Sequence, residues 1–171
     1  DGSSILPKDK RWNSAWAVGI GWTPSNYGFL KGNKVLTQLN LKASYGVTAN
    51  LNGVSVSSTV ASFKYSTSSY ENQRPLEFVS LYNSDLVPEQ NKNLDMGISF
   101  GLWNRLSFDL CWYDRKTEDA LLDVPIPSST GYTTLMRNIG VLQNKGVEIN
   151  FNAKILDSYD WHFSIGGNLA Y

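Results

Sequence analysis

The chain has 171 residues, which is enough for one domain of ordinary size. Its 15 Lys and Arg residues balance its 15 Asp and Glu residues, so the charge indicates neither a nucleic-acid partner nor a polybasic membrane anchor. Aromatic residues make up 13% of the sequence and Gly occurs 14 times, a composition that favours β-strands joined by many turns.

Six segments alternate between apolar and polar residues with a period of two, as half-buried strands do. In chain order they are 11–22, 38–49, 92–102, 105 to about 124, 138–155 and 160–171. Most are about twice as long as an ordinary strand, and a tilted membrane strand needs about 9–11 residues. The length of the segments therefore favours a membrane sheet.

The connections between these segments alternate in length. Trp103-Asn104 and residues 156–159 read as tight turns, 23–37 is intermediate, and 50–91 and 125–137 are long loops. Short turns at one end and long loops at the other are typical of outer-membrane barrels. This pattern predicts that the long loops share one end of the sheet.

Bulky aromatic residues lie near the ends of the apolar rows, for example Trp12, Trp22, Trp161 and Tyr171. Trp and Tyr gather at membrane interfaces because their rings are apolar with a polar edge. The same aromatics could instead form the core of a soluble sheet. Alternation alone does not decide whether an apolar row faces lipid or a core.

The single cysteine, Cys111, excludes an intrachain disulfide, and with the single histidine, His162, it cannot make an ordinary zinc site. We expect no cofactor. Carboxylates cluster at Asp114, Glu118, Asp119 and Asp123. They could form a calcium site or a glycosidase pair, but Arg115 and Lys116 lie among them, so we interpret them as a solvated strand end and expect no enzyme.

Three stretches carry a family resemblance. The first combines RWNSAWAVGIGW (11–22) with FLKGNKVLTQLNLKASYGVTAN (29–50). The second runs from NSDLVPE (83–89) to the SSTGY that ends at residue 132. The third and most specific is NIGVLQNKGVEI (138–149). Together they resemble the C-terminal part of the barrel of SusC/RagA-type TonB-dependent transporters of the Bacteroidota. Ser84 replaces the family's usual Pro, and Val87-Pro88 replaces its usual Lys-Trp.

The resemblance implies an all-β fold, an antiparallel transmembrane β-barrel segment with about six strands of a 22-stranded barrel. Residues 1–171 would be part of the barrel domain, with the plug and the TonB-interacting segment outside them. A barrel needs at least about eight strands to close, so we expect a fragment of a larger chain.

The implied function is import of bulky nutrients, glycans or peptides, across the Gram-negative outer membrane. The implied partners are a SusD-like surface lipoprotein, TonB and membrane lipid, besides the solute itself. The alternative is a soluble extracellular carbohydrate-binding β-domain whose apolar rows turn inward.

In the orientation that the family implies, loops 50–91 and 125–137 are extracellular. Their side chains could bind a solute by stacking and hydrogen bonding. The candidate residues are Tyr65, Tyr70, Tyr82, Tyr132 and Asn138. The alternative is that these residues pack loop on loop or contact the lipoprotein.

Overall fold

A computed structural model describes residues 2–28, 30–69, 71 and 73–171, which form two compact units. Unit 1 comprises Asp1–Ala15, Thr48–Asn91 and Thr117–Leu142, and unit 2 comprises Trp16–Val47, Lys92–Lys116 and Gln143–Tyr171. Among the residues described, no helix has the length and apolar character needed to cross a membrane.

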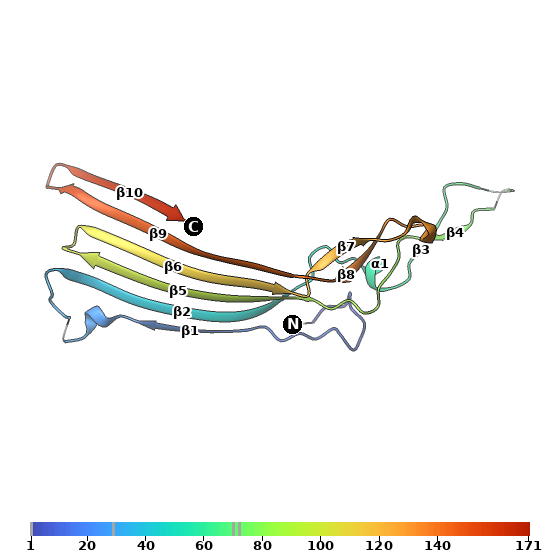
Figure 1. The fold of residues 1–171 in the computed structure, drawn as a ribbon, viewed down its shortest axis with the longest axis horizontal. Coiled ribbons are helices and arrows are strands. Elements are labelled where there is room, and N and C mark those ends of the chain that lie inside the picture. Colours follow the sequence, from blue (N-terminus) through green and yellow to red (C-terminus); the bar gives the residue numbers. More distant parts are fainter. Residues whose placement is uncertain (1, 29, 70, 72) are drawn as a thin grey trace. The chain divides into compact units, whose positions relative to one another are not determined.

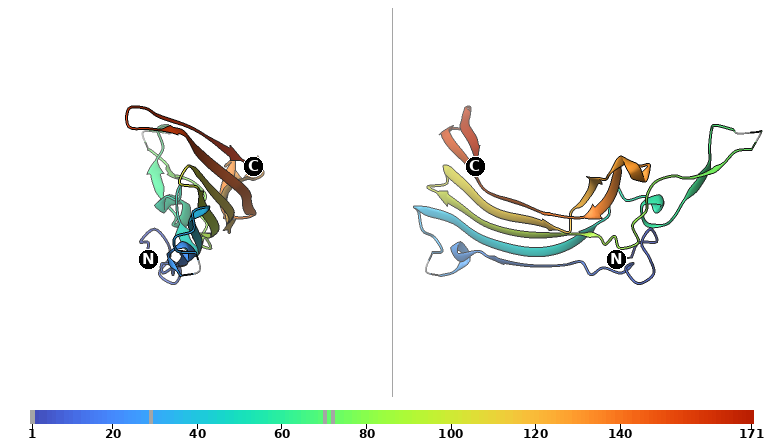
Figure 2. Two further views of the ribbon diagram at one scale, coloured as in Figure 1. Left: turned by 90° about the vertical axis from the view of Figure 1, so that its left-hand side faces the viewer. Right: turned by 45° about the vertical axis from the view of Figure 1, so that its right-hand side comes forward.

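Unit 2 contains most of a sheet that has six strands among the described residues. The strand order of this sheet is β1-β2-β5-β6-β9-β10 (Figure 1). The strands are β1 (Trp16–Trp22), β2 (Leu36–Asn50), β5 (Glu89–Leu102), β6 (Leu106–Glu118), β9 (Val141–Asp157) and β10 (His162–Ala170). Figure 2 shows β2, β5 and β6 bowing in the same direction. Each predicted segment corresponds to one strand of this sheet, so the all-β prediction is confirmed.

Two strand ends differ from the prediction by more than three residues. The first strand begins at Trp16 rather than at residue 11, because Trp12 instead makes an isolated bridge with Gly2. The fourth strand stops at Glu118 rather than near residue 124, because Asp119 adopts a φ of 55°. A positive φ at a non-glycine residue breaks the extended backbone.

The registers place apolar residues opposite apolar residues. In the antiparallel pair of β1 and β2, Trp16 faces Val47 and Val18 faces Tyr45. In the pair of β9 and β10, Ile149 faces Leu169. Directly opposed residues point to the same side of a sheet, so the apolar rows of neighbouring strands share one face.

The predicted tight turns are present. Between β5 and β6 the Arg105 amide donates to the Leu102 carbonyl over 3.0 Å, and Trp103 and Asn104 have φ values of 52° and 56°. Two positive φ values at the centre of the turn are the signature of type I′, the turn that matches strand twist. Between β9 and β10 the Ser158 amide donates to the Trp161 carbonyl over 2.9 Å.

Unit 1 contains regular structure that the sequence did not predict, in and next to the two long loops. It comprises the short helix α1 (Val56–Thr59), the hairpin of β3 (Phe63–Tyr65) and β4 (Leu76–Phe78), and the hairpin of β7 (Leu121–Pro125) and β8 (Thr134–Asn138). Leu6, Val54 and Leu86 form a small core, with Ile5, Leu51, Leu121 and Met136 packed against it. Apolar burial thus holds these loops together.

Candidate functional site

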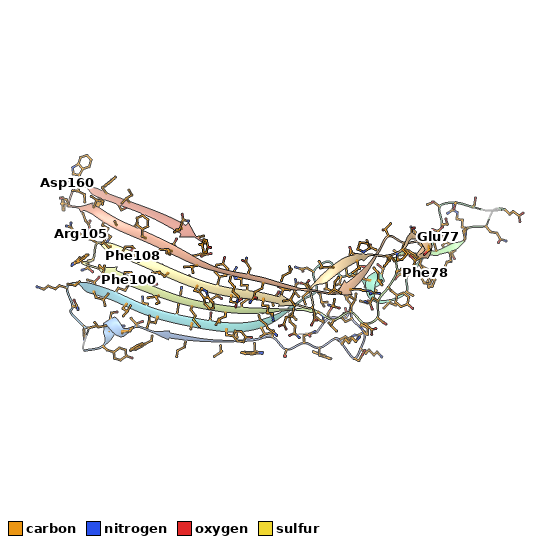
Figure 3. The ribbon with its side chains drawn as sticks, in the orientation of Figure 1. Glu77, Phe78, Phe100, Arg105, Phe108 and Asp160 are labelled. Atoms are coloured by element: carbon orange, nitrogen blue, oxygen red, sulfur yellow. The ribbon has the colours of Figure 1, made fainter. Side chains whose placement is uncertain are left out.

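One face of the sheet in unit 2 carries large apolar side chains that remain exposed. Phe100 of β5 and Phe108 of β6 stack with ring centroids 5.0 Å apart (Figure 3), and Trp16 meets Tyr45 edge to face at 5.5 Å. Ile20 is 73% exposed. A continuous apolar face of this kind marks a surface that contacts a partner or lipid.

The opposite face is built from small and polar residues that leave room for long side chains. A Cβ atom placed on Gly146 would lie 2.5 Å from the hydroxyl oxygen of Tyr113 and 2.8 Å from the backbone oxygen of Tyr171. The Asn-Lys-Gly stretch at 144–146 therefore needs its glycine, because Tyr113 crosses directly over it.

The apolar row on β6 and β9 ends in charged residues towards the long loops. Asp114 follows Trp112 in the same row, and Lys145 precedes Val147. The Lys145 ammonium lies 3.5 Å from the Asp114 carboxylate, and the Gln143 amide donates to the same carboxylate over 2.8 Å. This change from aromatic to ionic side chains is what a membrane boundary requires.

The acidic stretch does not assemble a metal site within the described residues, where no three His, Cys, Asp or Glu side chains gather to hold a metal ion. Asp114 is paired with Lys145, and Asp123 lies in the strand β7. A calcium ion would need several carboxylate oxygens at one point.

The described candidate tyrosines, Tyr65, Tyr82 and Tyr132, lie in unit 1, where Tyr65 and Tyr82 are exposed and Tyr132 is half-buried. Tyr65 ends β3 and is 69% exposed, and Tyr82 lies between β4 and β5. The Tyr132 hydroxyl donates to the Phe78 carbonyl over 3.5 Å, which links the β7–β8 hairpin to the β3–β4 hairpin. Tyr70 lies outside the described residues.

The β3–β4 hairpin carries two apolar cross-strand pairs that the sequence did not predict. Phe63 faces Phe78, with ring centroids 4.5 Å apart, and Tyr65 faces Leu76. Figure 3 labels Phe78 and its neighbour Glu77 on β4. The alternation of Phe63, Lys64 and Tyr65 was the available signal, but three residues are too few to predict a strand.

Asn138 lies at the end of β8, and its side chain makes three hydrogen bonds. Its amide nitrogen donates to the carbonyl oxygens of Val87 (2.7 Å) and Asp119 (2.8 Å), and its oxygen accepts from the Val87 amide (2.9 Å). Both amide protons are engaged, a geometry that favours a structural role. Contact of Asn138 with a solute stays a prediction.

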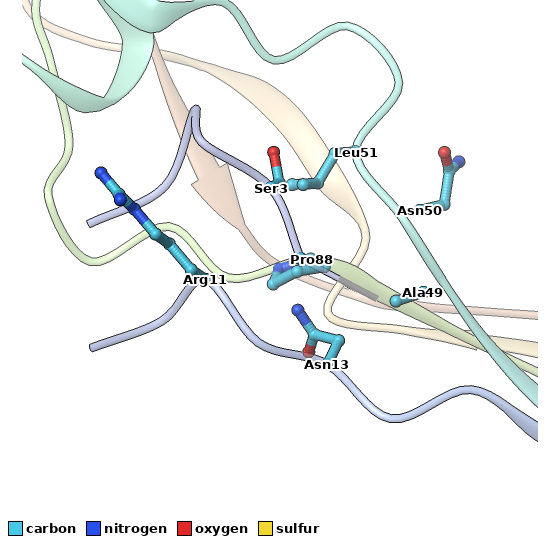
Figure 4. A pocket seen from close by; sticks show the side chains of 8 residues that line it. Ser3, Arg11, Asn13, Ala49, Asn50, Leu51 and Pro88 are labelled. Atoms are coloured by element: carbon cyan, nitrogen blue, oxygen red, sulfur yellow. The ribbon is translucent and has the colours of Figure 1, made fainter. Parts of the chain in front are cut away.

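A cavity of about 130 Å³ in unit 1 is distinct from the predicted tyrosines. Its lining side chains include Ser3, Asn13, Asn50 and Pro88 (Figure 4). The Arg11 guanidinium points away from the other labelled side chains in Figure 4 and donates to the Leu6 carbonyl over 3.0 Å. The cavity thus presents no converging charge to a ligand.

Long antiparallel strands with an exposed apolar face, tight turns and elaborate loops define the class as the wall of a membrane β-barrel. The family model described as TonB dependent receptor-like, beta-barrel matches residues 1–171. The chain therefore belongs to the TonB-dependent receptor β-barrel family, whose members reside in the outer membrane.

Similar proteins bear out the resemblance to SusC/RagA-type transporters. TonB-dependent receptor SusC of Bacteroides thetaiotaomicron is 31% identical over 100% of this chain and 18% of its own length. TonB-dependent receptor P3 of Formosa agariphila is 31% identical over 99% of this chain and 17% of its own length.

Solved structures agree. The RagAB peptide importer in its closed-closed state has a TM-score of 0.88 and 29% identity, covering 99% of this chain and 19% of that one. The open-open state has a TM-score of 0.82 and 28% identity, covering 98% of this chain and 18% of that one. The chain thus spans less than a fifth of the length of these relatives.

Proposed function

We propose that residues 1–171 form part of the barrel wall of an outer-membrane TonB-dependent importer of bulky nutrients, glycans or peptides. The observation that carries the proposal is the match of nearly the whole chain to the RagAB peptide importer, with a TM-score of 0.88. The plug and the TonB-interacting segment would lie in the rest of a longer protein.

In this proposal the apolar face of the sheet contacts lipid and the polar face lines the lumen. The ion pair of Asp114 and Lys145 then lies at the outer boundary of the membrane. The loops of unit 1 are extracellular, where they meet the solute and a SusD-like surface lipoprotein. TonB supplies energy from the periplasmic side.

Aromatic residues in the loops of unit 1 are the proposed contact surface. Tyr65, Tyr70, Tyr82 and Tyr132 present rings and hydroxyl groups suited to stacking and hydrogen bonding with a large polar solute. We propose capture and transport, with no turnover of the solute. Asp114, one of the carboxylates considered for a glycosidase pair, instead pairs with Lys145 and accepts from Gln143.

The proposal is tested in the full-length protein in its own host. We expect deletion of the gene, or of tonB, to abolish saturable uptake of a fluorescein-labelled peptide digest or of a labelled oligosaccharide mixture. Unchanged uptake of both probes would contradict the proposal. A full-length protein that is monomeric in water without detergent would instead favour the soluble carbohydrate-binding alternative.

A further inference from the structure

The ends of four strands meet in unit 1 through the side chains of two residues. Glu89 is the first residue of β5, and Asn138 is the last residue of β8. Their partners include Asn50, the last residue of β2, and Leu121, the first residue of β7. We call Glu89 and Asn138 with these bonds the strand-end clamp.

The Glu89 carboxylate uses both of its oxygens. One oxygen accepts from the Asn50 side-chain amide over 3.2 Å, and the other accepts from the Leu121 backbone amide over 2.7 Å. The two donors are 39 and 32 residues away from Glu89 along the chain. Hydrogen bonds to an ionised acceptor are about twice as strong as neutral ones.

Asn138 makes the other hydrogen bonds of the strand-end clamp. Its three hydrogen bonds tie the end of β8 to Val87, two residues before β5, and to Asp119, between β6 and β7. Leu86, the residue before Val87, is fully buried in the core of unit 1. The NSDLVPE stretch therefore anchors its segment by burial and by hydrogen bonding together.

The strand-end clamp lies next to segments that carry two of the proposed solute-contact residues, Tyr82 and Tyr132. Tyr82 directly precedes Asn83, whose amide donates to the Met136 carbonyl of β8 over 3.2 Å. Tyr132 lies in the connection between β7 and β8, the two strands that the clamp holds at Leu121 and Asn138. A change in the clamp would therefore alter the arrangement of these tyrosines.

We propose that Glu89 and Asn138 are positioning residues for solute capture, which hold the loops carrying Tyr82 and Tyr132 in one arrangement. This inference rests on the proposed function. When the competent arrangement is less populated, the apparent affinity falls by the same factor, while a saturating solute restores the arrangement. The clamp therefore governs the apparent KM of uptake and leaves the maximal rate unchanged.

The test uses Glu89→Gln and Asn138→Asp in the full-length protein, with saturable uptake of the labelled peptide digest and oligosaccharide mixture as the readout. Glu77→Gln on the exposed β4 strand is the matched control, since it makes the same chemical change elsewhere in unit 1. We expect Glu89→Gln to raise the apparent KM by about 10-fold, the effect of losing one charge-assisted bond. Asn138→Asp removes the two hydrogen bonds that the amide donates and should raise the apparent KM by at least as much. We expect maximal rates within about 2-fold of wild type for both variants.

Two results would overturn the clamp. A lower maximal rate with unchanged KM would mean that Glu89 matters only for folding. A raised KM in Asn138→Asp but not in Glu89→Gln would mean that Asn138 contacts the solute directly.

A second measurement tests the clamp without relying on transport. Trypsin cleavage of intact cells after Arg137, inside β8, requires the β7–β8 hairpin to open, whereas Lys8 is exposed and lies outside the strands. We expect Glu89→Gln to speed cleavage after Arg137 by about 10-fold relative to cleavage after Lys8. Equal ratios in wild type and variant would overturn the clamp, whereas the absence of wild-type uptake would contradict only the proposed function.

Discussion

The two units differ in whether they bury apolar residues in a core. Among the described residues, the buried hydrophobic core consists of Leu6, Val54, Leu86 and Ala120. All four belong to unit 1. In unit 2, residues such as Ile20, Ile165 and Leu169 are more than half exposed. Unit 1 is stabilised by a core, whereas unit 2 presents its apolar rows to its surroundings, so a given substitution should act differently in each.

The largest effect is expected in the core of unit 1. Leu86→Ala removes a fully buried side chain and should cost about 2–5 kcal/mol of local stability. Hydrogen exchange of the backbone amides of residues 83–89 in the full-length protein measures this cost. Leu76→Ala, at a position 56% exposed, is the control. Equal loss of protection in both variants would contradict a packed core in unit 1.

The next effect is expected on the apolar face of unit 2. Phe151→Arg places a charge in the lipid-facing row, which costs about 2–4 kcal/mol near the membrane midplane. We expect a reduced amount of the full-length protein in the outer membrane. Asn150→Arg, on the polar face of the same strand, should be tolerated, and equal tolerance of both would place β9 in water.

A smaller effect is expected where side chains cross a glycine. Gly146→Ala would force its new methyl group against Tyr113 and the Tyr171 backbone, at a cost of about 1–3 kcal/mol. Gly21→Ala in β1 is the control, because a Cβ atom there would meet no atom within 4 Å. Thermal unfolding in detergent compares the two variants, and equal midpoints would contradict the close crossing.

The smallest effect is expected at the boundary of the apolar row. Asp114→Asn breaks the ion pair with Lys145, whose side chain is 55% exposed, so the expected cost is below about 1 kcal/mol. Thermal unfolding in detergent measures it. A much larger loss of stability would show that Asp114 holds something other than Lys145 and Gln143.

The sequence predicted unit 2 well because its signal is repetitive. Alternation from Val147 to Ile155 follows the two-residue period of a strand, and Trp103-Asn104 fits a tight turn. It did not predict the end of β6, since the positive φ of Asp119 is a local property that no period encodes.

Unit 1 was predicted less well because its structure depends on contacts between distant segments. Glu89 was part of a recognised stretch, but its partners lie 39 and 32 residues away. Asn138 was selected as a solute contact because it lies next to a polar loop, whereas its three hydrogen bonds are visible only in the folded chain. The exposure of Tyr65 was foreseeable from loop composition, whereas Tyr132 is half-buried and its hydroxyl reaches the Phe78 carbonyl.

The central claim is that the apolar face of the sheet is in contact with lipid. The most direct test attaches a fluorophore to single cysteines introduced at residues 147–155 of the full-length protein. All native cysteines, including Cys111, are first replaced by Ser, and a nitroxide dissolved in the membrane serves as quencher. The account predicts quenching that alternates along β9, strong at Ile149 and Phe151 and weak at Asn150 and Asn152. Uniform quenching, or the opposite alternation, would contradict it.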